Sequence, residues 1–92
     1  MNKYSVKPIP SDIQSALAER FRKLRKAKGY SQAEMAQRSG VSLGSLKRFE
    51  LTGQISLESL LKLAYLLDRL DDFMKVFEPG VDMKRLEKLF NS

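Results

Sequence analysis

Neither cysteine nor histidine occurs among the 92 residues of the chain. Without cysteine there can be no disulfide, no thiolate chemistry and no zinc site with sulfur ligands. Without histidine the chain lacks the commonest general base and the commonest metal ligand. Catalysis would rest on carboxylates, and no pair of them falls in a recognisable constellation. We therefore expect a protein that is not an enzyme and that needs no metal or other cofactor.

Long hydrophobic runs are also missing. No apolar stretch approaches the roughly 18 residues that a membrane span needs, and the opening MNKYSVKPIP has no apolar stretch of the kind found in secretory signals. These features predict a cytoplasmic protein without a membrane partner. The hydrophobic content of 42% is ordinary for a globular protein, and the length suits one domain.

The net charge of +6 is concentrated in the first half of the chain. Residues 19–50 hold nine Lys and Arg against three Asp and Glu, whereas residues 51–92 hold six against seven. A one-sided cationic field favours a polyanionic partner, because neutralised phosphates release condensed counterions. An ordinary solvated surface explains the same cluster, and composition alone does not decide between them.

Serines precede the segments with helical periodicity. Two of them have the capping-box spacing, with Gln14 or Glu34 three residues later. The candidate N-caps are Ser11, Ser31, Ser42 and Ser56. The periodicity predicts helices over 12–28, 32–39, 43–50 and 57–67, the first two ending at Gly29 and Gly40. A fifth helix, capped by Asp71 or Asp72, would carry Phe73 and Phe77 and stop at Pro79.

The sequence thus predicts an all-α fold with no convincing strand. We expect an extended arm over 1–10, a helical domain over 11–78 and a tail over 79–92 with an amphipathic helix at Met83–Phe90. The predicted inward positions are Ile13, Leu17, Phe21, Leu24, Met35, Leu46, Phe49, Leu60, Leu61, Ala64 and Leu67.

The most informative stretch is SQAEMAQRSGVSLGSLKRFE, from Ser31 to Glu50. It encodes two short helices joined by a tight turn, in which Gly40 can adopt the positive φ that reverses the chain. The outer positions of the second helix are small, polar or basic, which is typical of a helix whose N-terminal end enters the major groove of DNA.

Residues 17–67 resemble the Cro/C1-type (XRE) helix-turn-helix domain, through the spacing of SQAEMA, GVS and the final FE. The resemblance implies a compact five-helix, lambda-repressor-like fold, here with a short C-terminal helical extension. It further implies that Gln32 binds a phosphate, that Arg25 and Glu50 form a salt bridge, and that the Thr52–Gln54 loop lies against the DNA backbone. The base-facing positions would be Ser42, Leu43, Gly44 and Ser45, with Lys47 and Arg48 on a base or a phosphate.

Three positions depart from the family's common pattern. Leu43 and Gly44 replace long polar side chains, so we expect contact with a thymine methyl and close backbone approach instead of bidentate readout. Specificity would then depend on Lys47, Arg48 and DNA shape. Asp68 stands where a glycine commonly ends the fourth helix.

Several alternatives remain open at this stage. The basic run 20–28 is more often a solvated face, although Arg22, Lys26 or Lys28 could contact phosphate. The apolar residues near the C-terminus either complete the core or join two subunits. We favour a homodimer on a palindromic operator, with recognition helices about 34 Å apart. A second resemblance, over 42–73, is to regulators associated with HipA-type kinase toxins, which implies an antitoxin that binds a protein and represses its own operon.

Overall fold

The structure is a computed structural model that describes residues 7–80 and residue 88. Four α-helices follow one another, α1 (Pro10–Ala27), α2 (Gln32–Ser39), α3 (Leu43–Thr52) and α4 (Leu57–Leu66), and a short 3-10 helix, η1 (Leu70–Phe73), comes last. The described residues contain no strand, so the predicted all-α class is confirmed. Apart from Lys88, the helix predicted over 83–90 lies outside the described residues, as do residues 1–6 of the predicted arm.

The fifth predicted helix is wrong in type and in position. Leu70 begins a single 3-10 turn that ends at Phe73, and Asp71 and Asp72 lie inside it instead of capping it. The surrounding DRLDDF has too few apolar residues at helical spacing for a longer helix to gain stability from packing. The fold therefore has four α-helices where five were expected.

The start of α1 also differs from the prediction. Pro10 takes the first helical position, so Ser11 lies in the first turn and cannot be the N-cap. The Ile9 N–H donates to the Asp12 carboxylate at 3.0 Å. Proline is favoured at this position because its fixed φ suits a helix and its missing N–H would have had no partner there. The helix consequently begins two residues earlier than expected.

The other three serine caps are confirmed. The hydroxyl oxygens of Ser31, Ser42 and Ser56 each accept the N–H three residues later, at 3.0, 3.1 and 3.1 Å. Each bond satisfies a backbone donor that has no partner inside its helix. The N-terminal ends of α2, α3 and α4 are therefore set by the sequence locally. The predicted end of α3 is wrong, because the helix continues two residues further, to Thr52, before Gly53 ends it.

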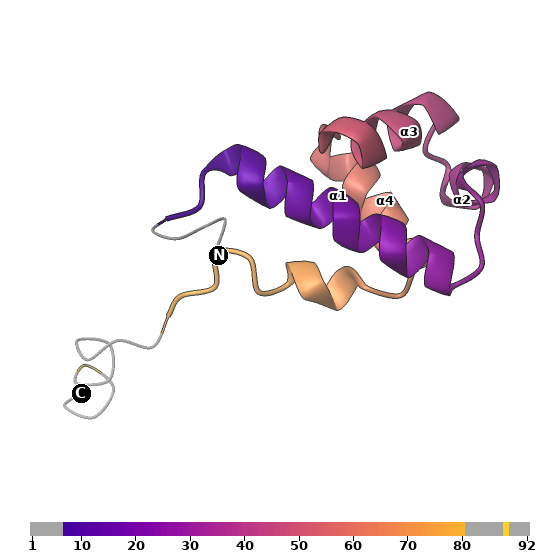
Figure 1. Cartoon of the computed structure of the whole chain (residues 1–92). Coiled ribbons are helices and arrows are strands. Elements are labelled where there is room, and N and C mark those ends of the chain that lie inside the picture. Colours follow the sequence, from indigo (N-terminus) through magenta and orange to yellow (C-terminus); the bar gives the residue numbers. More distant parts are fainter. Residues whose placement is uncertain (1–6, 81–87, 89–92) are drawn as a thin grey trace.

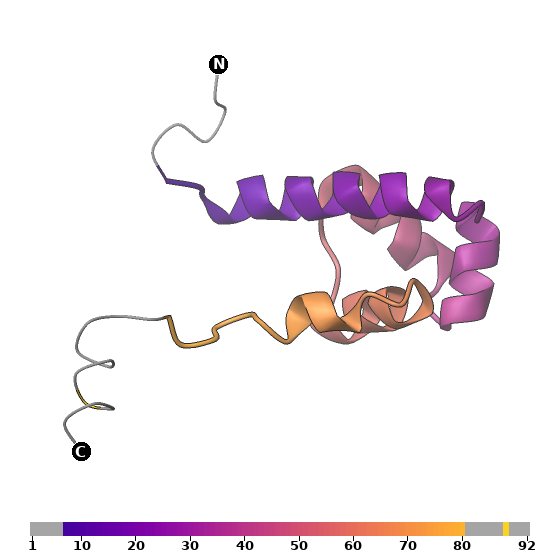
Figure 2. The ribbon, with the colours of Figure 1, turned by 90° about the horizontal axis from the view of Figure 1, so that it is seen from below.

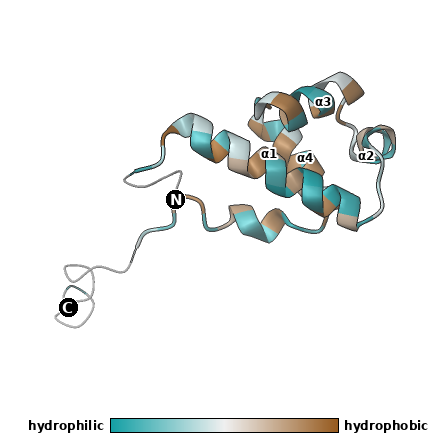
Figure 3. Ribbon diagram, in the orientation of Figure 1, coloured by the Kyte–Doolittle hydropathy of each residue, from teal (hydrophilic) through white to brown (hydrophobic). Residues whose placement is uncertain are grey.

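The core lies where α1 and α2 pack against α3. The α1 helix packs on α3, and α2 packs on both α3 and α4, an arrangement visible in Figures 1 and 2. The rings of Phe21 and Phe49 join α1 to α3, with centroids 5.5 Å apart and tilted by 50°. Figure 3 shows hydrophobic (brown) and hydrophilic (teal) segments alternating along α1 and α3, as expected for helices that bury one face. The buried hydrophobic residues are Ala18, Phe21, Met35, Ala36, Val41, Leu46, Phe49, Leu63, Ala64 and Leu67.

Two details of the predicted core need correction. Ile13 is 49% exposed, because the N-terminal end of the 18-residue α1 runs past the shorter helices it packs on (Figure 2). Leu63, which was not predicted, is completely buried, whereas Leu61 is only half-buried. Both errors arise from neighbours that the periodicity of one helix cannot reveal.

Candidate nucleic-acid interface

The turn between α2 and α3 fixes the angle between the two helices. Gly40 ends α2 with a φ of 79°, and its N–H donates to the Ala36 carbonyl at 3.0 Å. Beside this turn, Val41 is buried and Met35 and Leu46 are completely inaccessible to solvent. Because these side chains fill the space between the helices, the opposite face of α3 is left free of packing. The turn forms a helix-turn-helix, as the sequence predicted.

The free face of α3 begins at its N-terminus. Leu43, Gly44 and Ser45 are exposed in the first turn, and a Cβ added at Gly44 would meet open space. The Ser42 hydroxyl donates to Ser45 Oγ at 2.8 Å while it caps the helix, so these hydroxyls already have protein partners. The small residues Gly44 and Ser45 would let a flat or grooved surface approach the helix backbone next to Leu43.

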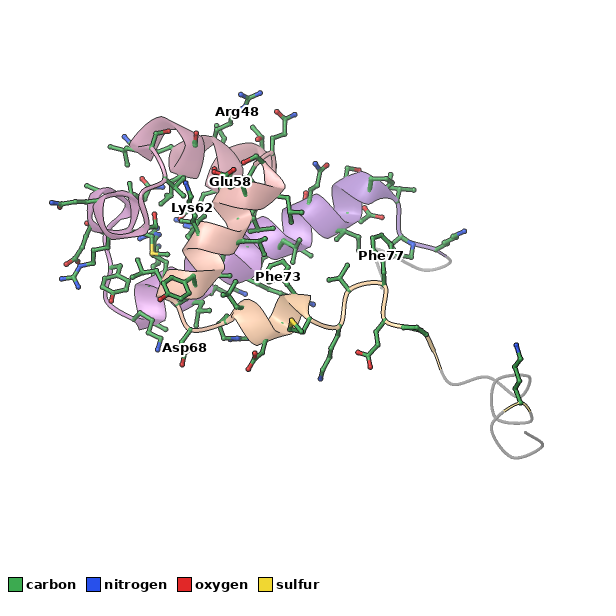
Figure 4. All side chains as sticks on the ribbon, turned by 180° about the vertical axis from the view of Figure 1, so that it is seen from behind. Arg48, Glu58, Lys62, Asp68, Phe73 and Phe77 are labelled. Carbon is green, nitrogen blue, oxygen red and sulfur yellow. The ribbon has the colours of Figure 1, made fainter. Side chains whose placement is uncertain are left out.

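Two cations lie further along the same helix. Lys47 and Arg48 are both exposed, and Figure 4 shows Arg48 pointing outward from α3. Among residues 7–80, neither has a carboxylate within salt-bridge distance, whereas Lys23, Arg38, Lys62 and Arg69 are each paired with an acid. The positive charge on this face of α3 is therefore not neutralised by the protein itself.

Glu50 lies at the centre of a buried polar cluster behind this face. Arg25 binds its carboxylate through one edge of the guanidinium, with Nε donating to Oε2 at 2.7 Å and Nη2 donating to Oε1 at 3.0 Å. The third arm of the guanidinium, Nη1, donates to the Tyr30 carbonyl at 2.7 Å. The side chains of Arg25 and Glu50 are only 7% and 5% exposed. The predicted salt bridge is present and ties α1 to α3.

Gln32 joins the same cluster. It occupies the first position of α2, where its backbone N–H has no partner inside the helix. Its side-chain Nε2 donates to Glu50 Oε1 at 3.1 Å, and the residue is half-buried. Glu50 thus orients the amide that the sequence assigned to a phosphate, and one N–H of that amide is already occupied.

The remaining predicted phosphate contacts lie on α1. Arg22 approaches Glu50 Oε1 at 4.0 Å and is 57% exposed, so it lies at the edge of the Glu50 cluster, near Gln32 and α3. Lys28 is exposed at the C-terminal end of α1 and forms the cap that leads to Gly29. Arg22 is therefore brought next to the other candidates through Glu50, whereas no hydrogen bond or ion pair within residues 7–80 links Lys28 to α3.

One feature of this surface was not predicted in detail. The Arg48 Nη2 donates to Gln54 Oε1 at 2.8 Å, which links α3 to the loop that follows it. Sequence reasoning placed the Thr52–Gln54 loop near the DNA backbone but did not connect it to Arg48. A six-residue separation outside a helix has no periodicity, so no local pattern could have indicated this bond.

The fold and the exposed, cationic face of α3 define a DNA-binding helix-turn-helix protein. A family model described as helix-turn-helix matches residues 21–72, more than half of the chain. The chain belongs to this family of DNA-binding transcription regulators, which confirms the Cro/C1-type resemblance seen in the sequence. No curated protein and no solved structure matches it significantly. No helix among the described residues is long and apolar enough to cross a membrane.

Proposed function

We propose that this protein is a sequence-specific transcriptional repressor that places the N-terminal end of α3 in the major groove. The observation that carries the proposal is the exposed face of α3, with Leu43 beside the small residues at 44 and 45, followed by Lys47 and Arg48, which form no ion pair within residues 7–80. In this position Leu43 would meet a thymine methyl, and Arg48 would reach a guanine edge or a phosphate. Bound at a promoter, the protein would block transcription.

The first test is titration with a pool of random double-stranded oligonucleotides at low salt, followed by selection of the bound fraction. We expect binding that weakens as salt rises. For each phosphate neutralised, the logarithm of the binding constant should fall by about 0.9 for every tenfold rise in salt concentration. The selected sequences then give the operator, and a promoter fused to it should be repressed in a reporter assay. Activation of the reporter would contradict the repressor role.

Two substitutions separate base contacts from phosphate contacts. Arg48→Ala should lower affinity for the selected operator by about 1–3 kcal/mol, the usual value of one base contact. Gln32→Ala should weaken binding by the same factor on every duplex, because a phosphate contact carries no sequence information. A changed base preference in Gln32→Ala would remove that residue from the phosphate contacts.

We also propose that the protein binds a palindromic operator as a homodimer. Support comes from apolar side chains after η1 that the described chain leaves uncovered, Met74 at 78% and Phe77 at 100% exposed; Figure 4 shows Phe77 beyond η1. Pairing of two subunits would bury them. Light scattering of the full chain and of a Met74→Ser/Phe77→Ser double variant tests this, and a dimer that persists in the double variant would contradict an interface through these side chains.

The antitoxin alternative is favoured by a separate surface. An apolar groove lined by Leu61, Tyr65, Leu66 and Leu70 runs between α2, α4 and η1, and no residue of α3 lines it. A protein partner, such as a HipA-type kinase toxin, could bind there while α3 holds DNA. A partner protein that co-purifies with the wild-type chain but not with Tyr65→Ser would support this role, provided that Tyr65→Ser still binds DNA as the wild type does.

A further inference from the structure

The side chain of Arg48 is oriented by a hydrogen bond within the protein itself. Its Nη2 donates to Gln54 Oε1 at 2.8 Å, although both residues are exposed and each side chain has many alternative rotamers. The two side chains line a shallow surface pocket together with Ser45, Ile55, Ser56 and Ser59. Fixing an arginine side chain costs rotamer entropy, so a contact that already orients Arg48 lowers the entropy that it would lose on binding DNA.

The loop that carries Gln54 is itself fixed to the backbone of Arg48. The Thr52 hydroxyl donates to the Arg48 carbonyl at 2.7 Å, and the Gln54 N–H donates back to Thr52 Oγ1 at 3.1 Å. With the Arg48–Gln54 bond, these contacts close a ring through Arg48, Thr52 and Gln54. Gly53, whose φ is 80°, makes the tight turn that the ring requires.

The bond to Gln54 leaves the guanidinium able to read a base. A guanidinium has five N–H groups, which form two edges of two parallel donors each, and a bond to one Nη2 hydrogen occupies only one edge. The other edge remains complete, and two parallel donors match the O6 and N7 acceptors of guanine in the major groove. The contact therefore orients the arginine without using up its binding capacity.

We propose that Gln54 is a specificity-determining positioning residue that holds Arg48 in the orientation that reads a guanine. This proposal rests on the proposed DNA-binding function of α3. Gln54 acts through Arg48, and Thr52 supports Gln54 from behind. The loop after the recognition helix thus contributes to base selection without touching the base.

The test measures affinities for the selected operator and for its single-base variants. Gln54→Ala should weaken operator binding about three- to tenfold, the value of one hydrogen bond. The loss should fall on the same operator position as in Arg48→Ala, and the double variant should bind no worse than Arg48→Ala alone. Gln54→Glu keeps an acceptor for Arg48, so it should keep the base preference while binding every duplex more weakly.

Gln37→Ala, at an exposed glutamine of α2, is the matched control and should not change the base preference. Circular dichroism should give the same unfolding midpoint for all of these variants. In the free protein, the NMR order parameter of Arg48 Nε–H should fall in Gln54→Ala. A uniform loss of Gln54→Ala on every sequence, an additive double variant or an unchanged order parameter in Gln54→Ala would overturn the proposal. If the wild-type chain binds no duplex, the DNA-binding function itself fails, and Gln54 loses this role with it.

Discussion

Gly53 combines a backbone requirement with a packing requirement. Its φ is 80°, and a Cβ at this position would lie 2.8 Å from Gln14 Cβ and 2.9 Å from the Gln14 carbonyl carbon on α1. Backbone atoms of a helix cannot move aside as a flexible side chain can. The end of α3 is therefore seated on α1 at a point where only glycine fits.

This double requirement predicts a larger effect for Gly53→Ala than for Gly40→Ala. Gly40 has nearly the same φ, 79°, but open space around its missing side chain. Gly40→Ala should cost about 1–2 kcal/mol for the left-handed conformation, and Gly53→Ala a further 1–3 kcal/mol for overpacking. Thermal unfolding of both variants measures the difference. Equal losses would contradict the close contact with Gln14.

Asp68 is an unfavourable residue for the position that it occupies. It adopts a φ of 59° after α4, in the position that the sequence marked as unusual, and the Arg69 N–H closes the turn on the Ala64 carbonyl at 2.8 Å. The left-handed conformation is unfavourable for a residue with a Cβ, and a negative charge is unfavourable at a helix C-terminus.

Asp68→Gly should therefore stabilise the protein by about 0.5–1 kcal/mol, which corresponds to a rise of a few degrees in Tm. Asp68→Asn removes the charge alone and should give a smaller gain. A lower Tm for Asp68→Gly would show that the carboxylate has a stabilising partner.

At the scale of the helices, the Arg25–Glu50 pair joins α1 to α3. Both side chains are almost fully buried, and all buried side-chain donors and acceptors in the described residues have partners. Removing one partner leaves an uncompensated buried charge, so Arg25→Ala should destabilise the fold by about 3–5 kcal/mol. Lys23→Ala, which removes an exposed pair with Glu19, should cost less than about 0.5 kcal/mol. A small effect of Arg25→Ala in urea unfolding would contradict this assignment.

Gly44 lies in the first turn of α3, and glycine stabilises a helix less than alanine does. Gly44→Ala should stabilise α3 by about 0.5–1 kcal/mol, because alanine is the better helix former and the added Cβ meets open space. If the backbone of α3 approaches the DNA here, the same methyl should lower operator affinity by about 1 kcal/mol or more. Ser15→Ala, at an exposed position of α1, is the control for the effect of helix propensity on stability. Higher stability with unchanged affinity would place Gly44 outside the interface.

The sequence predicted the helices well where the signal is local. Ser31, Ser42 and Ser56 cap the expected helices because an N-cap depends only on the residue and the next turn. The predictions failed where distant neighbours decide. Ile13 is exposed because the N-terminal end of α1 extends past the helices that α1 packs on. The ring through Gln54 depends on how the loop after α3 folds back. The Arg25–Glu50 bridge was predicted from the family resemblance, not from periodicity.

For the whole molecule, Lys47 and Arg48 give α3 an exposed positive charge that no carboxylate of the described residues neutralises. By contrast, Arg38 on α2, Lys62 on α4 and Arg69 before η1 each form a salt bridge with a neighbouring acid. The domain division expected from the sequence, with an arm over 1–10, a helix-turn-helix unit over 11–78 and a tail over 79–92, stays a prediction. If the tail joins two subunits, the operator should contain two half-sites whose centres are about one helical turn apart.

The most direct measurement of the central claim is methylation protection of the selected operator by dimethyl sulfate. This reagent modifies guanine N7 in the major groove and adenine N3 in the minor groove. With α3 in the major groove, guanine N7 should be protected by the wild-type protein, and Arg48→Ala should restore methylation at one guanine of each site. Protection confined to adenine N3, or no protection of any selected duplex, would contradict the account.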